Sequence, residues 1–176
     1  MSSGTTLTAS GAAVSPHTGG EEAPYDLEMN AEAIINMPTF EQLLEMDDDE
    51  EDSFDFIRSL VDTFHEQAMS TFAEMDENLA AQDLEALSRL GHFLKGSSAS
   101  VGLRRVPLTC GRIQNYGHLK DDSGEADITR PEALDRIAKA IAQLKVEYNE
   151  ADLFFRTFFA ADGVLDDHAA ERTPAV

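Results

Sequence analysis

The segment His92–Ser98, with the letters HFLKGSS, places a histidine, a lysine and a glycine close together on a predicted helix. An imidazole on a helix surface can accept a phosphoryl group on a ring nitrogen, and Lys95 at the i+3 position can neutralise part of the added negative charge. Gly96 adds no bulk beside the ring, so another protein could approach it closely. Glycine inside a helix costs about 1 kcal/mol relative to alanine, so its presence there needs such a reason.

Charge along the chain favours the same segment. No Asp or Glu occurs between Ala86 and Lys120, although the chain contains 34 acidic residues and has a net charge of −21. The basic residues of this acid-free window are Arg89, Lys95, Arg104, Arg105, Arg112 and Lys120. A phosphohistidine with a charge of about −2 would therefore meet little repulsion from nearby carboxylates. The overall charge disfavours nucleic acid and anionic lipid, so we expect proteins or cations as partners.

Helical periodicity dominates the chain, and we find no convincing strands. A capping box at Thr39–Gln42 predicts a short helix that ends at Met46. The acidic run Asp47–Asp52 is expected to form a solvated turn and the acidic start of the next helix, whose apolar stripe extends from about Ser53 to Leu79. A third helix is expected after it.

The third helix is predicted to begin after Asp83 as its N-cap and to stop at Gly102. Pro107 suits the first turn of a fourth helix, which would run to about Tyr116. The connection between these two helices is short, as is usual for neighbouring helices in a bundle.

A second capping box at Thr129–Glu132 opens a last long helix that is expected to end near Gly163. Four such amphipathic helices predict an all-α fold, an up-and-down four-helix bundle with the short first helix across one end. Composition predicts a disordered acidic tail at residues 1–36, a bundle domain at 37–163 and a flexible C-terminal tail at 164–176.

The helical wheel of the third helix predicts where its histidine points. The inward stripe centres near Leu87, Leu94 and Ser98, and His92 lies about 150° away from it. We therefore expect His92 to face solvent. Its neighbours on the wheel are Glu85, Ser88, Lys95, Gly96 and Ala99. A surface histidine without a role is the alternative, and the interior glycine and the acid-free window argue against it.

A family resemblance adds to this interpretation. The stretch from His92 to Gly117, HFLKGSSASVGLRRVPLTCGRIQNYG, resembles the phosphorylated segment of histidine-containing phosphotransfer (HPt) proteins, especially the fungal intermediates of the osmosensing phosphorelay. The resemblance extends upstream through LLEMDDDEEDSF and FHEQAMSTFAEM and covers about Met37 to Leu119. The helix from Thr129 matches mainly in its pattern.

The resemblance implies roles for the residues of this segment. His92 would be the phospho-acceptor, Lys95 the charge-neutralising lysine and Gly96 the glycine that leaves room for the partner. Ser97 and Gln114 correspond to polar neighbours that orient the site.

His118 departs from the family pattern, in which we expect an arginine. An imidazole, unlike a guanidinium, is only partly protonated near neutral pH, so positive charge on this side of the site is reduced. The resemblance implies reversible in-line transfer between His92 and an aspartate of a receiver domain, so the protein would be a phosphoryl carrier and not a kinase. It would need no cofactor of its own, because the receiver would supply Mg²⁺.

The expected partners are the receiver domain of a hybrid histidine kinase and the receiver domains of response regulators. In family members the first two helices offer an apolar patch to the receiver. The candidate receiver-docking residues here are Leu43, Met46, Phe56, Leu60 and Gln67. Leu43 and Leu60 could equally be core residues, whereas Phe56 is expected to be exposed.

The sequence allows two alternative functions, a metal-binding bundle and a helical adaptor. A carboxylate-bridged metal bundle needs two inward Glu-x-x-His motifs, and the nearest match is a single Asp62-x-x-His65, so we expect no metal site. A helical adaptor could bind partners through the same apolar patch without phosphorylation of His92. Phosphate transfer to His92 would separate this alternative from the carrier.

Location and assembly are inferred from what the sequence lacks. The single Cys110 agrees with a reducing compartment, and we find neither a signal peptide nor an apolar run of the roughly 20 residues that cross a bilayer. We therefore expect the protein in the cytoplasm and also in the nucleus, away from membranes. Because the bundle fills its own seams, we expect a monomer.

Overall fold

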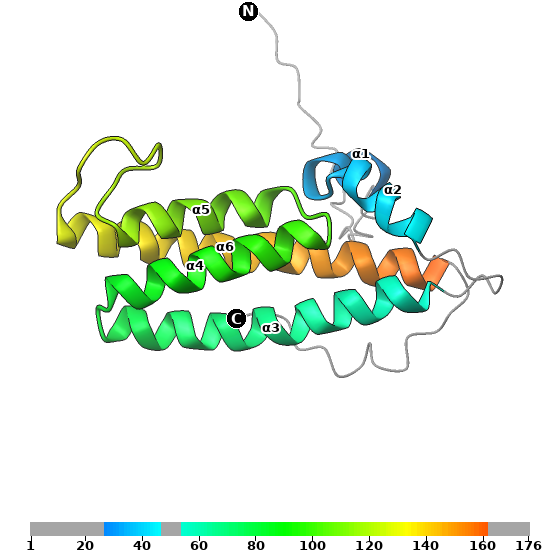
Figure 1. Cartoon of the computed structure of the whole chain (residues 1–176), viewed down its shortest axis with the longest axis horizontal. Coiled ribbons are helices and arrows are strands. Elements are labelled where there is room, and N and C mark those ends of the chain that lie inside the picture. Colours follow the sequence, from blue (N-terminus) through cyan, green and yellow to red (C-terminus); the bar gives the residue numbers. More distant parts are fainter. Residues whose placement is uncertain (1–26, 47–53, 162–176) are drawn as a thin grey trace, which may run out of the picture.

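The computed structural model describes residues 27–46 and 54–161, and six helices occur in this part of the chain (Figure 1). They are α1 (Leu27–Ile34), α2 (Met37–Met46), α3 (Asp55–Ala80), α4 (Leu84–Ser100), α5 (Arg105–Gly117) and α6 (Arg130–Ala161). Apart from two isolated β-bridges, the described residues contain no β-structure. The all-α prediction is confirmed.

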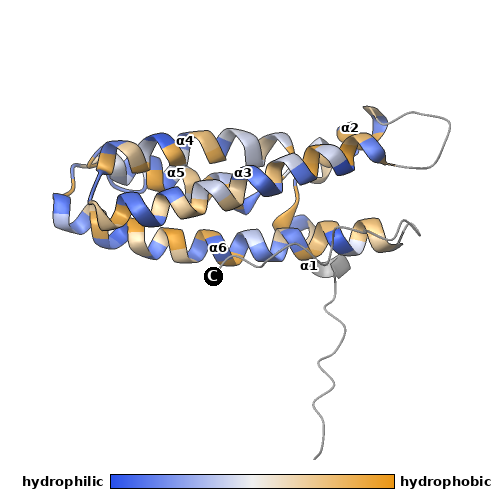
Figure 2. Ribbon diagram, turned by 90° about the horizontal axis from the view of Figure 1, so that it is seen from below, coloured by the Kyte–Doolittle hydropathy of each residue, from blue (hydrophilic) through white to orange (hydrophobic). Residues whose placement is uncertain are grey.

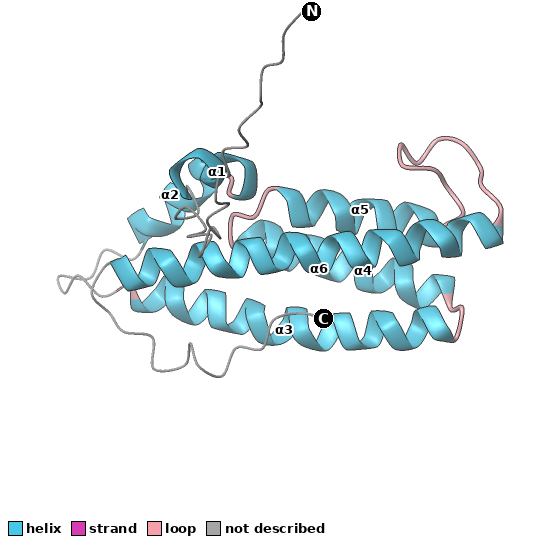
Figure 3. Ribbon diagram, turned by 180° about the vertical axis from the view of Figure 1, so that it is seen from behind, coloured by secondary structure: helices cyan, strands magenta, loops and turns pink. Residues whose placement is uncertain are grey.

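Helices α3 to α6 run along the long axis of the molecule (Figure 1). Helix α4 packs against α3 and α5, and α6 packs against α3 and α5, which closes the four-helix bundle. The short helices α1 and α2 lie at one end, and the loop between α5 and α6 projects from the other (Figure 3). The bundle and its short additional N-terminal helix were therefore predicted correctly.

The core follows from the amphipathic pattern of the helices, along which hydrophobic and hydrophilic residues alternate (Figure 2). Each helix of the bundle contributes side chains with no exposed surface, for example Ile57 of α3, Leu87 of α4, Ile113 of α5 and Leu144 of α6. Burial of one such side chain stabilises the fold by about 1.5–3 kcal/mol. Packing of these apolar faces fixes which sides of α4 remain exposed.

The two ends of α4 match the predicted signals. Asp83 is the N-cap, and its carboxylate accepts a 3.0 Å hydrogen bond from a backbone N–H in the first turn. Past the other end, Gly102 has a φ of 75°, a left-handed conformation that favours glycine. Its N–H donates to the carbonyl of Ala99 and that of Leu103 to the carbonyl of Ser98, which is the Schellman arrangement.

Helix starts differ from the predictions in detail. Helix α2 begins at Met37 rather than Thr39, because the carbonyl of Asn36 accepts the backbone N–H groups of both Thr39 and Phe40. The predicted capping box therefore lies inside the helix. Pro107 lies in the first turn of α5, as predicted.

The predicted disordered tail is wrong for residues 27–36, which include α1. Ile34 and Ile35 are 5% and 1% exposed and belong to the core. The backbone N–H of Asn36 donates to the carbonyl of Gly102 at 2.7 Å, and that of Arg104 donates to the carbonyl of Ile34 at 2.8 Å. These contacts attach the segment to the turn between α4 and α5.

Several expectations lie outside the described residues. They concern the tail at 1–26, the acidic turn at Asp47–Asp52, the helix start at Ser53, the helix end near Gly163 and the tail at 164–176. In the described ranges, no helix has both the length and the apolar character that crossing a membrane requires.

Candidate functional site

His92 lies on the exposed side of α4, as the helical wheel predicted. Leu87, Leu94 and Ser98 on the opposite side of this helix have 0% exposure. In the part of the chain that the structure describes, no hydrogen bond or ion pair reaches the imidazole. The ring is therefore open to solvent and to a second protein, with both ring nitrogens available for chemistry.

The residues beside the ring are small. Gly96 and Ala99 are exposed, and among the described residues no heavy atom beyond the neighbouring backbone of α4 lies within 4 Å of a Cβ added at Gly96. The fold itself therefore does not require glycine at this position. A visiting protein gains the space that a side chain would have filled.

Lys95 extends from α4 across α5. A Cβ added at Gly111 would lie 3.6 Å from Nζ of Lys95, so the lysine lies over the side-chain-free position of α5. Its position relative to His92 on the helix still allows the ammonium to turn towards a group on the imidazole. The structure thus confirms that Lys95 is exposed and places its charge at the seam between α4 and α5.

Ser88 connects α4 to His118 at the C-terminal end of α5. Its hydroxyl lies 3.1 Å from the carbonyl oxygen of Gln114 and 3.0 Å from Nε2 of His118. When the hydroxyl donates to the carbonyl, it can accept a hydrogen bond from Nε2–H of His118. Because Ser88 precedes His92 by one helical turn, this bond brings His118 to the same region of α4.

Ser88, which the helical wheel places beside His92, is buried. Its exposed fraction is 2%, because it faces α5 rather than solvent. A helical wheel of α4 alone identifies the stripe that faces the core but not the separate contact with α5. The signal available in the sequence was Gly117, where an added Cβ would come within 2.6 Å of Cβ of Ser88.

Ser97 and Gln114 are both half-buried. The hydroxyl of Ser97 lies 3.5 Å from the carbonyl oxygen of Phe93 and 3.4 Å from that of Leu94, which is long for a hydrogen bond within its own helix. Gln114 takes part through its backbone carbonyl, which Ser88 contacts. Their predicted role in orienting the site stays a prediction.

Comparison with protein families gives a match to the Hpt domain over residues 59–147, which include His92 and both seams of α4. The chain belongs to the Hpt domain family.

Curated relatives of this Hpt protein come from fungi. Multistep phosphorelay regulator 1 of Schizosaccharomyces pombe is 42% identical over 141 residues, which are 77% of this chain and 47% of that protein. Phosphorelay intermediate protein YPD1 of Candida albicans is 46% identical over 85 residues, 48% of this chain and 45% of the relative. The chain spans about half the length of the curated relatives it matches.

Solved structures show the same fold. The crystal structure of the yeast phosphorelay protein YPD1 matches with a TM-score of 0.62 and 31% identity, covering 72% of this chain and 95% of that one. A co-crystal structure of Ypd1 of Saccharomyces cerevisiae with the receiver domain of its downstream response regulator Ssk1 matches with a TM-score of 0.61 and 34% identity, at 72% and 95% coverage. The family resemblance inferred from the sequence is therefore confirmed.

The predicted docking residues of this Hpt protein differ in exposure. Met46 at the end of α2 is 69% exposed and Phe56 in the first turn of α3 is 46% exposed. Leu43 and Leu60 are half-buried and pack against the core, and Gln67 is half-buried. Met46 and Phe56 are thus exposed, at the end of α2 and the start of α3, and the expected exposure of Phe56 is confirmed.

Among the exposed apolar residues that were not predicted, Phe93 and Leu108 lie on α4 and α5. Phe93, next to His92, is 50% exposed, and Leu108 on α5 is 68% exposed. Consecutive residues of a helix point about 100° apart, so Phe93 lies neither on the stripe that faces the core nor on the side of His92. The helical wheel therefore did not identify it. Leu108 lies two residues from both Val106 and Cys110, which are buried, so a helical wheel of α5 places it about 200° from them, on the outer side.

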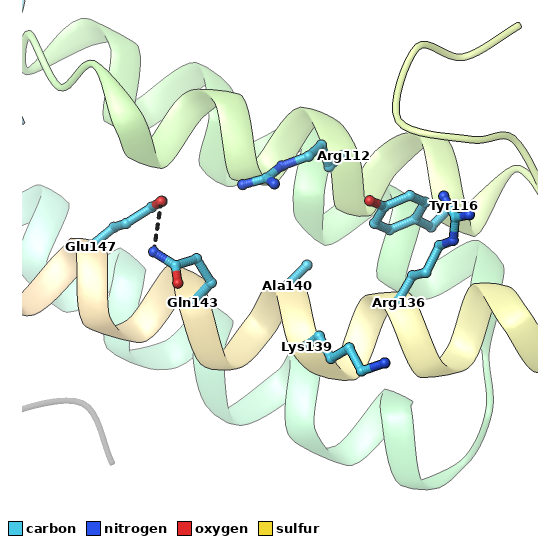
Figure 4. Close-up of a pocket in the computed structure, with 7 residues that line it drawn as sticks. All are labelled: Arg112, Tyr116, Arg136, Lys139, Ala140, Gln143 and Glu147. Atoms are coloured by element: carbon cyan, nitrogen blue, oxygen red, sulfur yellow. Dashed lines mark hydrogen bonds between the residues drawn. The ribbon is translucent and has the colours of Figure 1, made fainter.

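A groove of about 470 Å³, which we call the α5–α6 groove, lies between these two helices (Figure 4). Its lining residues are Arg112, Tyr116, Arg136, Lys139, Ala140, Gln143 and Glu147. Burial and the hydrogen bond to Asp122 raise the pKa of Tyr116. Glu147 accepts hydrogen bonds from Thr109 at 2.7 Å and from Gln143 at 3.1 Å, so this carboxylate joins α5 to α6.

His65, which the metal-bundle alternative invoked, lies away from solvent between α3 and α6. Its Nδ1 contacts the hydroxyl of Tyr148 and lies 3.7 Å from a carboxylate oxygen of Asp152. Residues 27–46 and 54–161 contain no group of three or more His, Cys, Asp or Glu that could hold a metal ion.

Proposed function

We propose that this protein is a phosphorelay intermediate in which His92 carries the phosphoryl group. The observation that supports it best is the open imidazole of His92, with Gly96 beside it, on a helix that has no carboxylate after Glu85. The Hpt family match covers this helix, and relatives that share up to 46% identity are named phosphorelay proteins. Sequence, geometry and family membership thus point to one residue.

The proposed reaction is in-line transfer from a receiver aspartate. The lone pair of an imidazole nitrogen of His92 forms a bond to phosphorus while the bond from phosphorus to the aspartyl oxygen breaks. The electrons of that bond leave with the carboxylate, and the other ring nitrogen keeps its proton. The reverse exchange passes the group to the aspartate of a second receiver.

The chain supplies charge and space to this step. Lys95 neutralises part of the phosphoryl charge after its ammonium turns from Gly111 towards the ring. Gly96 admits the receiver, and Ser97 and Gln114 orient the site. His118, held at Ser88, adds positive charge only while its ring is protonated.

The proposed partners are receiver domains of a hybrid kinase and of response regulators, which dock on Met46 and Phe56, with Leu43, Leu60 and Gln67 at the edge of this patch. The co-crystal of the yeast relative with a receiver domain supports this kind of partner. The receiver supplies the Mg²⁺ that neutralises charge on the transferred phosphoryl group. We further propose that the protein has no ATP-dependent kinase activity, acts as a monomer in an osmosensing pathway, and works in the cytoplasm and nucleus.

The test is phosphate transfer from a radiolabelled phosphorylated receiver domain to the full chain. We expect acid-labile label on the unsubstituted protein and none on His92→Gln, which still binds the receiver within about tenfold, or 1.4 kcal/mol. His118→Gln is the matched control and is expected to accept label. Label on His92→Gln, or receiver binding without any label on the unsubstituted chain, would favour the adaptor alternative.

A further inference from the structure

Helices α4 and α5 border a groove of about 460 Å³, which we call the α5 groove. The residues that matter in it are Lys95, Pro107, Leu108, Gly111, Arg112 and Asp122. Leu108 is 68% exposed, so a large apolar side chain projects from the outer surface of α5. Gly111 leaves room for Lys95 to lie across this helix.

Lys95 and Arg112 are the two basic side chains of the α5 groove. Most other lysines and arginines among the described residues form ion pairs with carboxylates. Arg105, Lys120, Arg136 and Lys139 all form ion pairs with carboxylates. Within the described residues, neither Lys95 nor Arg112 forms one. Arg112 donates a hydrogen bond to the hydroxyl of Thr109. It also lines the α5–α6 groove, so it lies where the two grooves meet (Figure 4).

Unpaired cations are unusual in a protein with a net charge of −21. Helix α5 contains no acidic residue at all, and α4 has only Glu85, which pairs with Arg89 at 3.3 Å. Since charges beyond about 8 Å are largely screened at physiological salt, a ligand in the groove meets these local cations rather than the total charge. The nearest acidic lining residue is Asp122, whose carboxylate is engaged by Tyr116 and Arg136.

We propose that the α5 groove binds an acidic polypeptide segment of a partner protein, with carboxylates at Lys95 and Arg112 and an apolar side chain against Leu108. The exposed Leu108, with the half-buried Pro107 beside it, favours a polypeptide over a small inorganic anion. The overall negative charge of the chain opposes nucleic acid. The groove shares Lys95 with the proposed phosphotransfer site, but it does not include His92, and binding of a polypeptide here goes beyond the transfer of a phosphoryl group.

Fluorescence anisotropy of the full chain tests the proposal with a short labelled peptide in which glutamates flank a central pair of leucines. We expect the matched glutamine peptide to bind at least about tenfold more weakly, because it lacks the charges that Lys95 and Arg112 recognise. The double variant Leu108→Ser/Arg112→Gln should also lose about tenfold. The matched control, Val146→Ser/Arg89→Gln, changes an exposed apolar residue and a paired arginine elsewhere and should stay within about twofold.

Four results would overturn the proposal. They are no binding of the glutamate peptide, equal binding by both double variants, complete competition by inorganic phosphate, and a rise in affinity when Glu21, Glu22 and Asp26 are replaced by their amides. The last result would show that an acidic segment of this chain itself occupies the groove. His92→Gln should bind the peptide normally, so the two proposals fail separately.

Discussion

Gly91 and Gly96 lie on the same helix, and their surroundings are opposite. A Cβ added at Gly91 would lie 2.9 Å from the carbonyl oxygen of Cys110 and 3.1 Å from the backbone nitrogen of Gln114. A Cβ added at Gly96 would have no neighbour within 4 Å. One glycine lets α4 approach the backbone of α5, whereas the other lies beside an open imidazole.

This difference separates structural from functional reasons for glycine in a helix. Both positions lose helix propensity, by about 1 kcal/mol relative to alanine. At Gly91 the close packing of α5 offsets that cost within the fold. At Gly96 no contact among the described residues does so, and we attribute the residue to the approach of another protein.

Gly91→Val tests whether the close packing of α4 on α5 requires glycine at this position. Overpacking against the α5 backbone is expected to destabilise the fold by about 3 kcal/mol, measured by urea unfolding. Gly96→Val on the same helix is the matched control and should change the free energy of unfolding by less than about 0.5 kcal/mol. Similar losses at both sites would show that the two environments are not different.

The contact between α4 and α5 also buries the thiol of Cys110, so the stability of the fold is expected to depend on the protonation of this thiol. Burial raises the pKa of its thiol from 9.0 to about 12, Glu147 adds to the effect and Lys95 partly opposes it. Above pH 9 the unfolded chain loses the thiol proton and the folded chain keeps it, so stability falls as pH rises towards 12. We expect a loss of about 2 kcal/mol between pH 9 and 10.5 that is absent in Cys110→Ala.

The measurement is urea unfolding of both proteins at the two pH values. Lysine and tyrosine titration lowers the stability of both, so only the difference between the two slopes counts. Equal slopes would mean that the seam between α4 and α5 admits water to Cys110.

Ser88→Ala removes the hydroxyl that contacts both the carbonyl of Gln114 and the ring of His118. The expected loss of stability is about 1 kcal/mol, because the carbonyl of Gln114 keeps the backbone N–H of His118 as a donor at 3.3 Å. The ring ¹⁵N shifts of His118 should change and those of His92 should not. An unchanged His118 signal would mean that the contact with Ser88 does not form in solution.

The bundle was predictable from sequence because each helix buries one continuous apolar stripe. Asp83 and Gly102 marked the ends of α4, and the same stripe placed His92 on the opposite side. These signals are local, since they depend on spacing along one helix. The exposure of the central site residue was therefore obtained before any tertiary contact was known.

The remaining features depend on contacts between distant segments. Helix α1 is held by Ile34, Ile35 and backbone bonds to the turn after α4, which composition does not encode. The burial of Ser88 depends on its contact with α5, which a helical wheel of α4 alone does not contain. The direction of Lys95 depends on Gly111 of another helix, and a long flexible side chain has no direction of its own.

Gly96→Ala is the smallest change and addresses the open face directly. Alanine should stabilise the fold by up to about 1 kcal/mol, because it improves helix propensity and its Cβ meets nothing. The same methyl group would project towards a docked receiver, so phosphate transfer should slow while stability rises. Urea unfolding and single-turnover transfer measure the two effects on one protein. If transfer proceeds unchanged, the space beside His92 is not used by the partner, and the glycine would need a different explanation.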